Sequence, residues 1–332
     1  MRLPPRHSWR TLLPLVGTVV LVGWFVQSMD RAGFIRALQL CNVPMLAGGL
    51  VVAGLVAWVY DSLTLTWLVH ATLRHRGRPE PLGLRDLAPV KAASYVLNIA
   101  NYHAATLGIA WVIARRKQVP FLEGAGALAA MSWIDLVAVT TMATIGLQVA
   151  PDIVVGAPAL QGWLQRVALA VFALALASLL VLQSPLRWAP LDRLRHWSVL
   201  RPLAALGPAR MLQGIVLRFG VVMIYLVSSM WVMRAFGMQP DFGRMLVALP
   251  ILTIVGTIPL SVSGLGTTQV VMRTLYAPFV VDGREASAVI DAMSTVQIVG
   301  FIAVRLLIAA PFLRPVLEEL RKRPPEPESA GP

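Results

Sequence analysis

The sequence predicts an all-α polytopic membrane protein with about six transmembrane helices and two re-entrant broken-helix hairpins, arranged as an inverted-topology repeat. Three observations lead to this fold class: the composition, the lengths of the apolar segments, and the distribution of basic residues between them. Of the 332 residues, 57% are hydrophobic and 14% are charged, whereas a soluble domain carries about 25% charged residues. The mean hydropathy is +0.70, so we expect the chain to be embedded in a membrane.

Six segments are apolar over a length sufficient for a full crossing, which takes about 20 residues. They are residues 11–28, 43–72, 121–149, 163–183, 212–236 and 286–313. The first follows a basic N-terminus, as the apolar part of a signal peptide does. Because no A-x-A-like cleavage site follows it and a second apolar segment comes directly after, we interpret it as an uncleaved first helix.

Two further apolar stretches are interrupted in the middle, residues 84–116 by a break at 98–103 and residues 245–279 by a break at 259–269. Each half of these stretches is shorter than a full crossing. We therefore predict two hairpins that enter and leave the membrane on the same side. Irregular backbone at such depth is tolerated only where it is buried in protein or lines a water-filled cavity.

The basic residues support this arrangement. With the N-terminus inside, the cytoplasmic segments carry the basic clusters at residues 2–10, 74–91, 115–117, 187–210 and 314–323. The outer loops carry only Arg31, Arg36, Arg244 and Arg284. This asymmetry follows the positive-inside rule and predicts cytoplasmic N- and C-termini. The expected location is the cytoplasmic (inner) membrane of a bacterial cell. A full crossing at residues 84–116 would place one basic cluster outside.

The order of elements repeats. Residues 11–149 and residues 163–313 each contain two spans, a hairpin and a third span. Three crossings per half give the halves opposite orientations, an architecture that lets one central site face either side in turn. We expect a single transmembrane domain over residues 1–315, an interfacial basic linker at 184–211 and a disordered cytoplasmic tail at 316–332.

Several classes of function are disfavoured by the residues present. Cys41 is the only cysteine, so neither an intrachain disulfide nor a cysteine metal cluster can form. There is no zinc-ligand spacing and no P-loop, and no segment between the spans is long enough for a soluble catalytic domain. We therefore expect no cofactor, no metal and no enzymatic activity. The net charge is +13, and the basic residues responsible for it lie in loops beside apolar spans. This position favours anionic or zwitterionic lipid headgroups over nucleic acid as partners.

Two blocks of sequence carry a family resemblance. The first begins with the break at Asn98 and continues through Arg115-Arg116, Val119-Pro120 and Ile134-Asp135-Leu136; the second contains Pro259 and Gly264-Leu265-Gly266. Over about residues 10–315 the chain resembles the lysylphosphatidylglycerol synthase transmembrane-domain family, also described as flippase-like integral membrane proteins. Gln269 stands where the family often has Glu. The resemblance implies movement of a lipid or lipid-linked headgroup between leaflets, without the soluble aminoacyl-transfer domain.

The second break is the stronger candidate for contact with a substrate headgroup. Its glycines permit close backbone approach, Thr267 or Thr268 can cap the helix that follows, and free N–H groups at a helix start suit a phosphate. A structural turn is the alternative. The candidate substrate-binding residues here are Ser261, Ser263, Gly264, Gly266, Thr267, Thr268, Gln269 and Arg273.

The first break contributes Asn98, Asn101 and His103, either as backbone partners or, for His103, as a proton acceptor near neutral pH. Charges within spans are costly, so each should be paired or line a cavity. The candidates for coupling or buried charge are Asp135, Asp291, Asp61 and Arg218.

The leading function is therefore a flippase-like lipid transporter working by alternating access. A transporter of a small soluble solute fits the repeat equally well. A membrane partner of a lipid-modifying or envelope-assembly enzyme is a third alternative, and the sequence leaves a homo-oligomer open.

Overall fold

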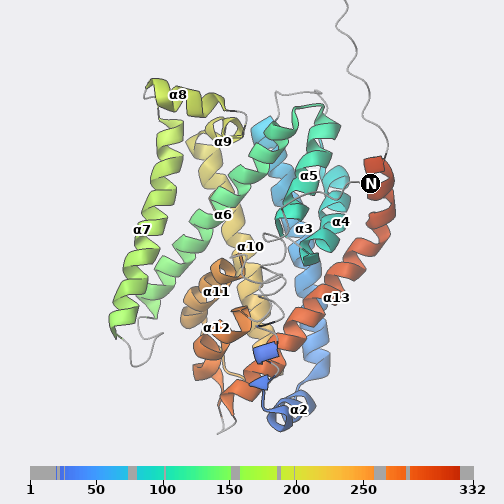
Figure 1. The fold of residues 1–332 in the computed structure, drawn as a ribbon, viewed down its shortest axis with the longest axis vertical. Helices are drawn as coiled ribbons and strands as arrows, with labels where there is room; N and C mark the ends of the chain where they lie inside the picture. The colour runs from blue at the N-terminus through green and yellow to red at the C-terminus, as the bar shows by residue number, and fades with distance from the viewer. Residues whose placement is uncertain are drawn as a thin grey trace, which may run out of the picture.

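Every regular element among the residues that the structure describes is a helix (Figure 1). The computed structural model describes residues 20, 23–25, 27–73, 81–100, 102–150, 158–184, 188–197, 199–257, 267–281 and 285–321. In chain order the helices are α2 (Arg31–Gln39), α3 (Val43–Leu73), α4 (Leu84–Ala100), α5 (Tyr102–Lys117), α6 (Phe121–Val149), α7 (Pro158–Gln183), α8 (Ala189–His196), α9 (Arg201–Ala204), α10 (Gly207–Ala235), α11 (Phe242–Thr257), α12 (Thr267–Tyr276), the 3-10 turn η2 (Ala277–Phe279) and α13 (Ala286–Arg321).

Four of these helices, α3, α6, α10 and α13, are long and apolar enough to cross a membrane. They correspond to four of the six predicted spans. The predicted span at 163–183 lies in α7, whose apolar part, Ala168–Gln183, is shorter. Most of the predicted first span, residues 11–28, lies outside the described residues, so both of these spans stay predictions.

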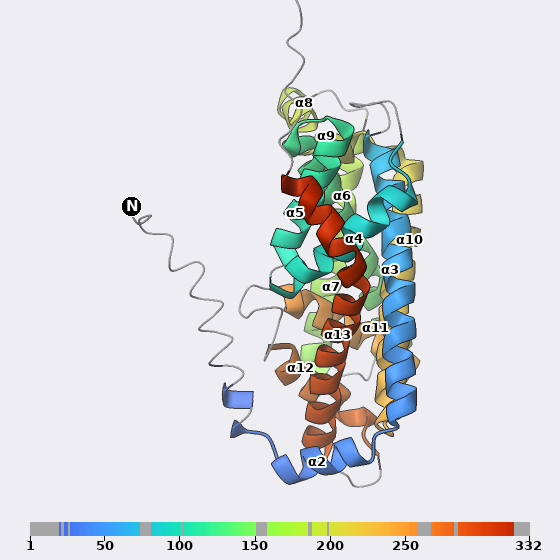
Figure 2. The ribbon, with the colours of Figure 1, turned by 90° about the vertical axis from the view of Figure 1, so that its right-hand side faces the viewer.

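Each broken stretch forms two short helices. Helices α4 and α5 pack against each other and lie in the upper part of the molecule, whereas α11 and α12 lie in its lower part (Figures 1 and 2). Helix α4 continues to Ala100 and α5 begins at Tyr102, so both helices extend into the break expected at 98–103. At the second break, α12 begins at Thr267, inside the interruption expected at 259–269. Residues 258–266 lie outside the described part.

The helices pack in an ordered set of pairs. α3 packs along α10, α4 packs on α13, and α11 packs on α6. α5 lies beside α6 and α12 lies beside α13. The largest hydrophobic core joins residues of α3, α6, α10, α11 and α13, so the two halves of the chain share one interior.

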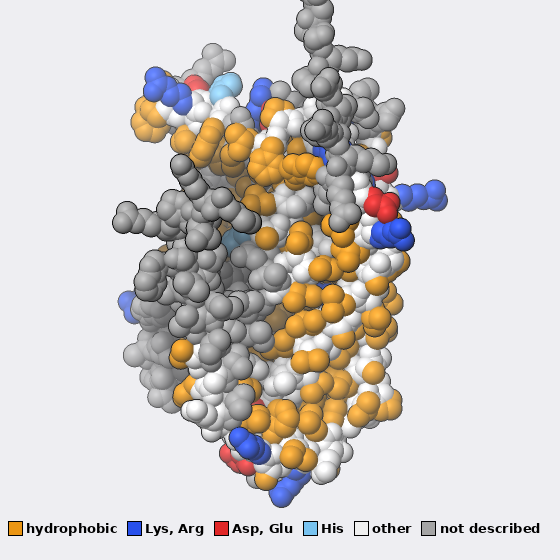
Figure 3. Space-filling view, turned by 45° about the vertical axis from the view of Figure 1, so that its right-hand side comes forward, with side chains coloured by type: hydrophobic (Ala, Val, Ile, Leu, Met, Phe, Trp, Pro, Cys, Tyr) orange, Lys and Arg blue, Asp and Glu red, His pale blue; other side chains and the backbone are white. Residues whose placement is uncertain are grey.

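The outer surface of the long helices is apolar. Exposed side chains include Val52 and Val56 on α3 and Val299 and Leu307 on α13. Figure 3 shows hydrophobic side chains over the middle of one long face, with most charged side chains toward its two ends. This distribution suits a chain whose sides contact lipid and whose ends contact headgroups and water.

The basic linker folds into two short helices at one end of the molecule. Trp188, Leu194 and Trp197 around α8 are exposed, which fits the predicted position at the membrane surface. Arg195 donates to the carbonyl oxygens of Leu182, at 2.9 Å, and of Val181, at 3.1 Å. It thereby satisfies free carbonyl groups at the end of α7.

The last helix is longer than the sequence pattern indicates. α13 continues through Pro311 and Pro315 to Arg321, so the boundary expected at residue 315 falls inside a helix. Residues 322–332 of the predicted tail lie outside the described residues.

The contact between α6 and α11 depends on a glycine. A Cβ atom at Gly146 would lie 2.7 Å from Leu246 Cβ and 2.8 Å from the Leu246 carbonyl carbon. Because backbone cannot yield as a flexible side chain can, Gly146→Val should cost about 1–3 kcal/mol of stability. Thermal unfolding in detergent measures the effect. Gly48→Val on α3 is the control, since nothing lies within 4 Å of its Cβ; equal melting temperatures for the two variants would contradict the assignment.

Candidate functional site

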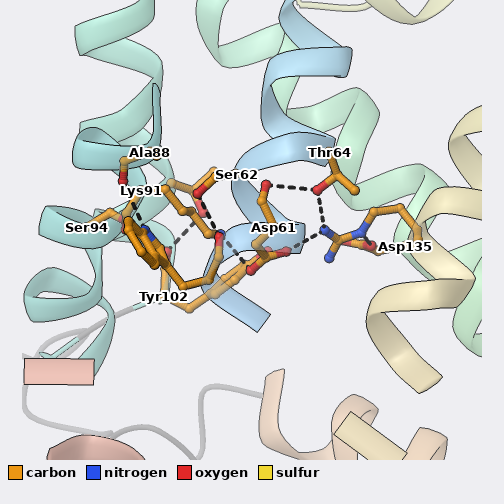
Figure 4. A network of polar contacts seen from close by, with 11 residues as sticks. Asp61, Ser62, Thr64, Ala88, Lys91, Ser94, Tyr102 and Asp135 are labelled. Atoms are coloured by element: carbon orange, nitrogen blue, oxygen red, sulfur yellow. Dashed lines mark hydrogen bonds and ion pairs between the residues drawn. The ribbon is translucent and has the colours of Figure 1, made fainter. Parts of the chain in front are cut away.

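Asp61 on α3 lies between two cations from different helices. Lys91 Nζ on α4 is 3.1 Å from Asp61 Oδ2, and Arg218 Nη1 on α10 donates to Asp61 Oδ1 at 2.8 Å. The side chain of Asp61 is only 8% exposed. In Figure 4, Lys91 lies on one side of Asp61, and Thr64 and Asp135 lie on the other side. Both carboxylate oxygens are therefore occupied.

Arg218 extends this contact to a third helix of the first half. Its Nε donates to Asp135 Oδ1 on α6, and its Nη1 also lies 3.4 Å from Thr64 Oγ1. Thr64 in turn donates its hydroxyl to the main-chain oxygen of Asp61 at 2.9 Å. We call Asp61, Lys91, Asp135 and Arg218 the buried charge network. Its two acids and two bases compensate each other, which lowers the cost of charge at this depth.

The spacing along each helix explains how the network assembles. Asp61 and Thr64 are three residues apart and so lie on one face of α3. Lys91 and Tyr95 are four residues apart on α4, and Lys91 Nζ lies 5.9 Å from the Tyr95 ring centroid. The guanidinium carbon of Arg305 on α13 lies 5.6 Å from the same centroid. Cation–π attraction at such distances favours both positive groups.

Asp135 is the open end of the network. Its side chain is 24% exposed, more than that of Asp61 or Arg218. Its Oδ1 accepts from Arg218, and its Oδ2 accepts no hydrogen bond from the part of the chain that is described. A carboxylate with one oxygen available can take a further donor, a cation or a proton.

A second buried ion pair lies in the other half. Arg273 on α12 donates from Nε to Asp291 Oδ1 at 2.7 Å and from Nη2 to Asp291 Oδ2 at 2.6 Å. Asp291 on α13 is 1% exposed. Arg273 Nη1 donates to Ser28 Oγ at 3.0 Å, and the rings of Trp24 and Phe25 lie 5.5 and 5.1 Å from its guanidinium carbon. This bidentate pair ties α12 to α13 and to the segment before α2.

The expectation that each acid in a span is paired is confirmed for Asp61, Asp135 and Asp291. Arg218 is the partner of Asp61 and Asp135, and Arg273 is the partner of Asp291. Arg273, expected as a headgroup contact, instead has its three nitrogens directed at Asp291 and Ser28.

The other candidates among the described residues lie on α4, α5 and α12. Gln269 is buried on α12 and Thr268 is half-buried. His103 is exposed, and its ring meets the Tyr102 ring edge-on, with the two ring centroids 5.6 Å apart. Asn98 is half-buried. Five further candidates lie outside the described residues, as does the side chain of Thr267. They are Asn101, Ser261, Ser263, Gly264 and Gly266.

Three members of the site are not among the sequence candidates. Contrary to the expectation that Lys91 belongs to a cytoplasmic basic cluster, its ammonium reaches Asp61. The available signal is its place inside the first apolar stretch, where a lysine needs a partner. Thr64 and Tyr95 carry no such signal, because hydroxyl residues in spans usually bond to their own helix.

The comparisons with known proteins agree with the resemblance. A family model described as the lysylphosphatidylglycerol synthase TM region matches residues 11–308. No curated protein and no solved structure gave a match. The matched range includes the buried charge network and the Arg273–Asp291 pair. Because the match covers far more than half of the chain, the protein belongs to the lysylphosphatidylglycerol synthase transmembrane-region family.

Proposed function

We propose that the protein is a flippase-like transporter of the bacterial cytoplasmic membrane, which moves a lipid or lipid-linked headgroup between leaflets by alternating access. The observation that carries the proposal is the buried charge network, which joins α3, α4 and α6 of the first half to α10 of the second. Charged groups at this depth commonly mark a substrate or ion pathway. In this proposal the partners are membrane lipids, and neither a cofactor nor catalysis is involved.

The packing of the helices supports the inverted repeat on which alternating access depends. In the proposed repeat, α3, α4, α5 and α6 of the first half correspond to α10, α11, α12 and α13 of the second half. Each contact within the protein should then have a counterpart between the corresponding helices. The contact of α4 with α13 then becomes the contact of α11 with α6, and the contact of α5 with α6 becomes that of α12 with α13. We propose that α4–α5 and α11–α12 are re-entrant hairpins entering from opposite faces, with both termini cytoplasmic.

A lipid substrate is favoured over a soluble solute by two observations. The family is named for a synthase whose product is a phospholipid, and the long helices present exposed apolar side chains. A zwitterionic or anionic headgroup carries charges that can replace ion-pair partners within the network. Its phosphate matches Lys91 and Arg218, and a cationic group, where present, matches the open oxygen of Asp135.

Movement of a headgroup past the network requires its ion pairs to separate. We propose that α4 moves away from α3, which breaks the pair between Lys91 and Asp61. Headgroup charges then replace the lost contacts, so that no buried charge is left without compensation. Arg218 stays bound to Asp61 and Asp135 from the second half and keeps the two halves in register.

Asp135→Asn is the direct test. The amide keeps the shape of the side chain but removes the negative charge that Asp135 Oδ2 presents to a headgroup. A hydrogen bond to a charged group is worth about 1.5–3 kcal/mol. The rate of flipping should therefore fall about tenfold or more. The measurement is the accessibility of a fluorescent phospholipid to a membrane-impermeant quencher in proteoliposomes. Glu318→Gln, in an exposed pair with Arg314, is the control and should flip normally.

Two outcomes would overturn the proposal. One is a flipping rate for the wild-type protein equal to that of empty liposomes, with phosphatidylglycerol, phosphatidylethanolamine and lysylphosphatidylglycerol analogues all tested. The other is uptake of a small soluble solute without lipid movement, which would establish the solute transporter instead.

A further inference from the structure

A surface groove lies between α3 and α10, near the end of the molecule where α2 lies. Its volume is about 360 Å³, within the range of ligand pockets, about 300–1,000 Å³. Its lining residues are Met45, Val227, Met230, Trp231, Arg234 and Phe242. Five of these six are apolar and one is an arginine, and none belongs to the buried charge network.

One wall of the groove is held rigidly in place. The Trp231 indole N–H donates to the Met45 carbonyl oxygen at 3.1 Å, which links α10 to α3. The Trp231 ring also packs so close to α3 that a Cβ at Gly49 would be 2.7 Å from Trp231 Cδ1. The ring is nevertheless partly exposed. A fixed, exposed aromatic wall near the end of a span suits contact with a lipid at the membrane interface.

Arg234 supplies the charge at the rim of this groove. It lies in the last turn of α10 and is exposed. Within the described part of the chain, no carboxylate forms an ion pair with it. An arginine at headgroup depth pairs well with phosphate, because the guanidinium offers two parallel N–H donors. The apolar wall and the unpaired cation together match the two parts of one phospholipid.

We propose that this groove binds one anionic phospholipid, with an acyl chain along Val227 and Trp231 and its phosphate on Arg234. The site is separate from the proposed transport pathway, since none of its lining residues belongs to the buried charge network. Anionic headgroups are favoured because Arg234 is the cation of the groove and no acid lines it.

The test is native mass spectrometry of the purified protein titrated with phosphatidylglycerol and, separately, with phosphatidylcholine. The wild type should hold one phosphatidylglycerol more tightly than further copies and more tightly than phosphatidylcholine. Arg234→Gln should weaken that first binding event about fivefold, the effect of one basic group near an anionic surface. Arg36→Gln, an exposed arginine on α2 at the same end, is the control and should leave it unchanged.

A second variant tests the position of the acyl chain. Val227 is exposed, so Val227→Trp should fold normally while filling the groove, and it should lower the first binding affinity as Arg234→Gln does. Wild-type affinity in either variant would overturn the proposal, as would equal binding of both lipids by the wild type. If Arg234→Gln unfolds, Arg234→Lys replaces it and should bind more weakly than wild type, because the paired N–H donors are lost. Loss of lipid binding with intact flipping would leave the transport proposal standing.

Discussion

Arg218→Met is expected to destabilise the protein by about 3–5 kcal/mol, the range for removing one partner from a buried ion pair. The substitution keeps much of the side-chain volume but leaves Asp135 without its described charged partner, and Asp61 with Lys91 alone. The loss should appear as a large fall in the thermal unfolding temperature in detergent. Flipping should be lost together with stability, because the link between the halves is removed.

A double variant separates the charge effect from lost packing. Arg218→Met combined with Asp135→Leu restores electrical balance within the network, so it should be more stable than Arg218→Met alone. Arg314→Met is the matched surface control, since Arg314 is 90% exposed and such a pair is worth about 0–1 kcal/mol. A double variant no more stable than the sum of the single changes would contradict charge coupling between α6 and α10.

Arg273→Ala should have an effect of similar size, about 3–5 kcal/mol, because it leaves the fully buried Asp291 carboxylate unpaired. Two roles for Arg273 remain to be separated: contact with a headgroup, as the sequence suggests, and the structural pair with Asp291. The double variant Arg273→Ala/Asp291→Ala removes both charges, so it should recover part of the lost stability.

Flipping by the double variant distinguishes the two roles. If Arg273 acts only through Asp291, a stable double variant should flip lipid at a rate near that of the wild type. If Arg273 also binds the headgroup, the double variant should be folded but slow. Ser28→Ala removes the Arg273 contact at 3.0 Å and the hydrogen bond that the Ser28 hydroxyl donates to the Phe25 carbonyl oxygen at 3.1 Å. It serves as a mild control, with an expected cost of about 0.5–1.5 kcal/mol per hydrogen bond.

The sequence was sufficient for the coarse architecture because that part rests on composition and length. Long apolar runs at residues 43–72, 121–149, 212–236 and 286–313 had to become helices, since backbone groups in lipid must be paired within their own segment. Helices α4 and α5 end and begin at Ala100 and Tyr102, within the predicted interruption at 98–103. Its extent was overestimated because Asn98 and His103 are polar yet helical.

The acids of the candidate site were also predictable. An Asp within an apolar span is costly enough to demand a partner, and this argument selected Asp61, Asp135 and Asp291 without any contact information. It could not assign the partners, because Lys91 and Arg273 lie on different helices from the acids that they bind, and the sequence does not give how those helices pack. Lys91 in particular lies at the end of the basic cluster at residues 74–91, so its position inside the apolar stretch was not used as a signal for a buried partner.

The sequence by itself determined that the protein is a helical membrane protein with broken stretches in both halves and with buried acids that need compensation. These properties depend on local hydrophobicity and on the cost of charge in an apolar medium, and each segment expresses them independently of the others. Only the tertiary structure decided that Arg218 bridges Asp61 and Asp135, that Lys91 belongs to the same network, and that Arg273 pairs with Asp291. Such pairings depend on how helices far apart in the chain pack and rotate against each other, and that packing is a property of the whole fold.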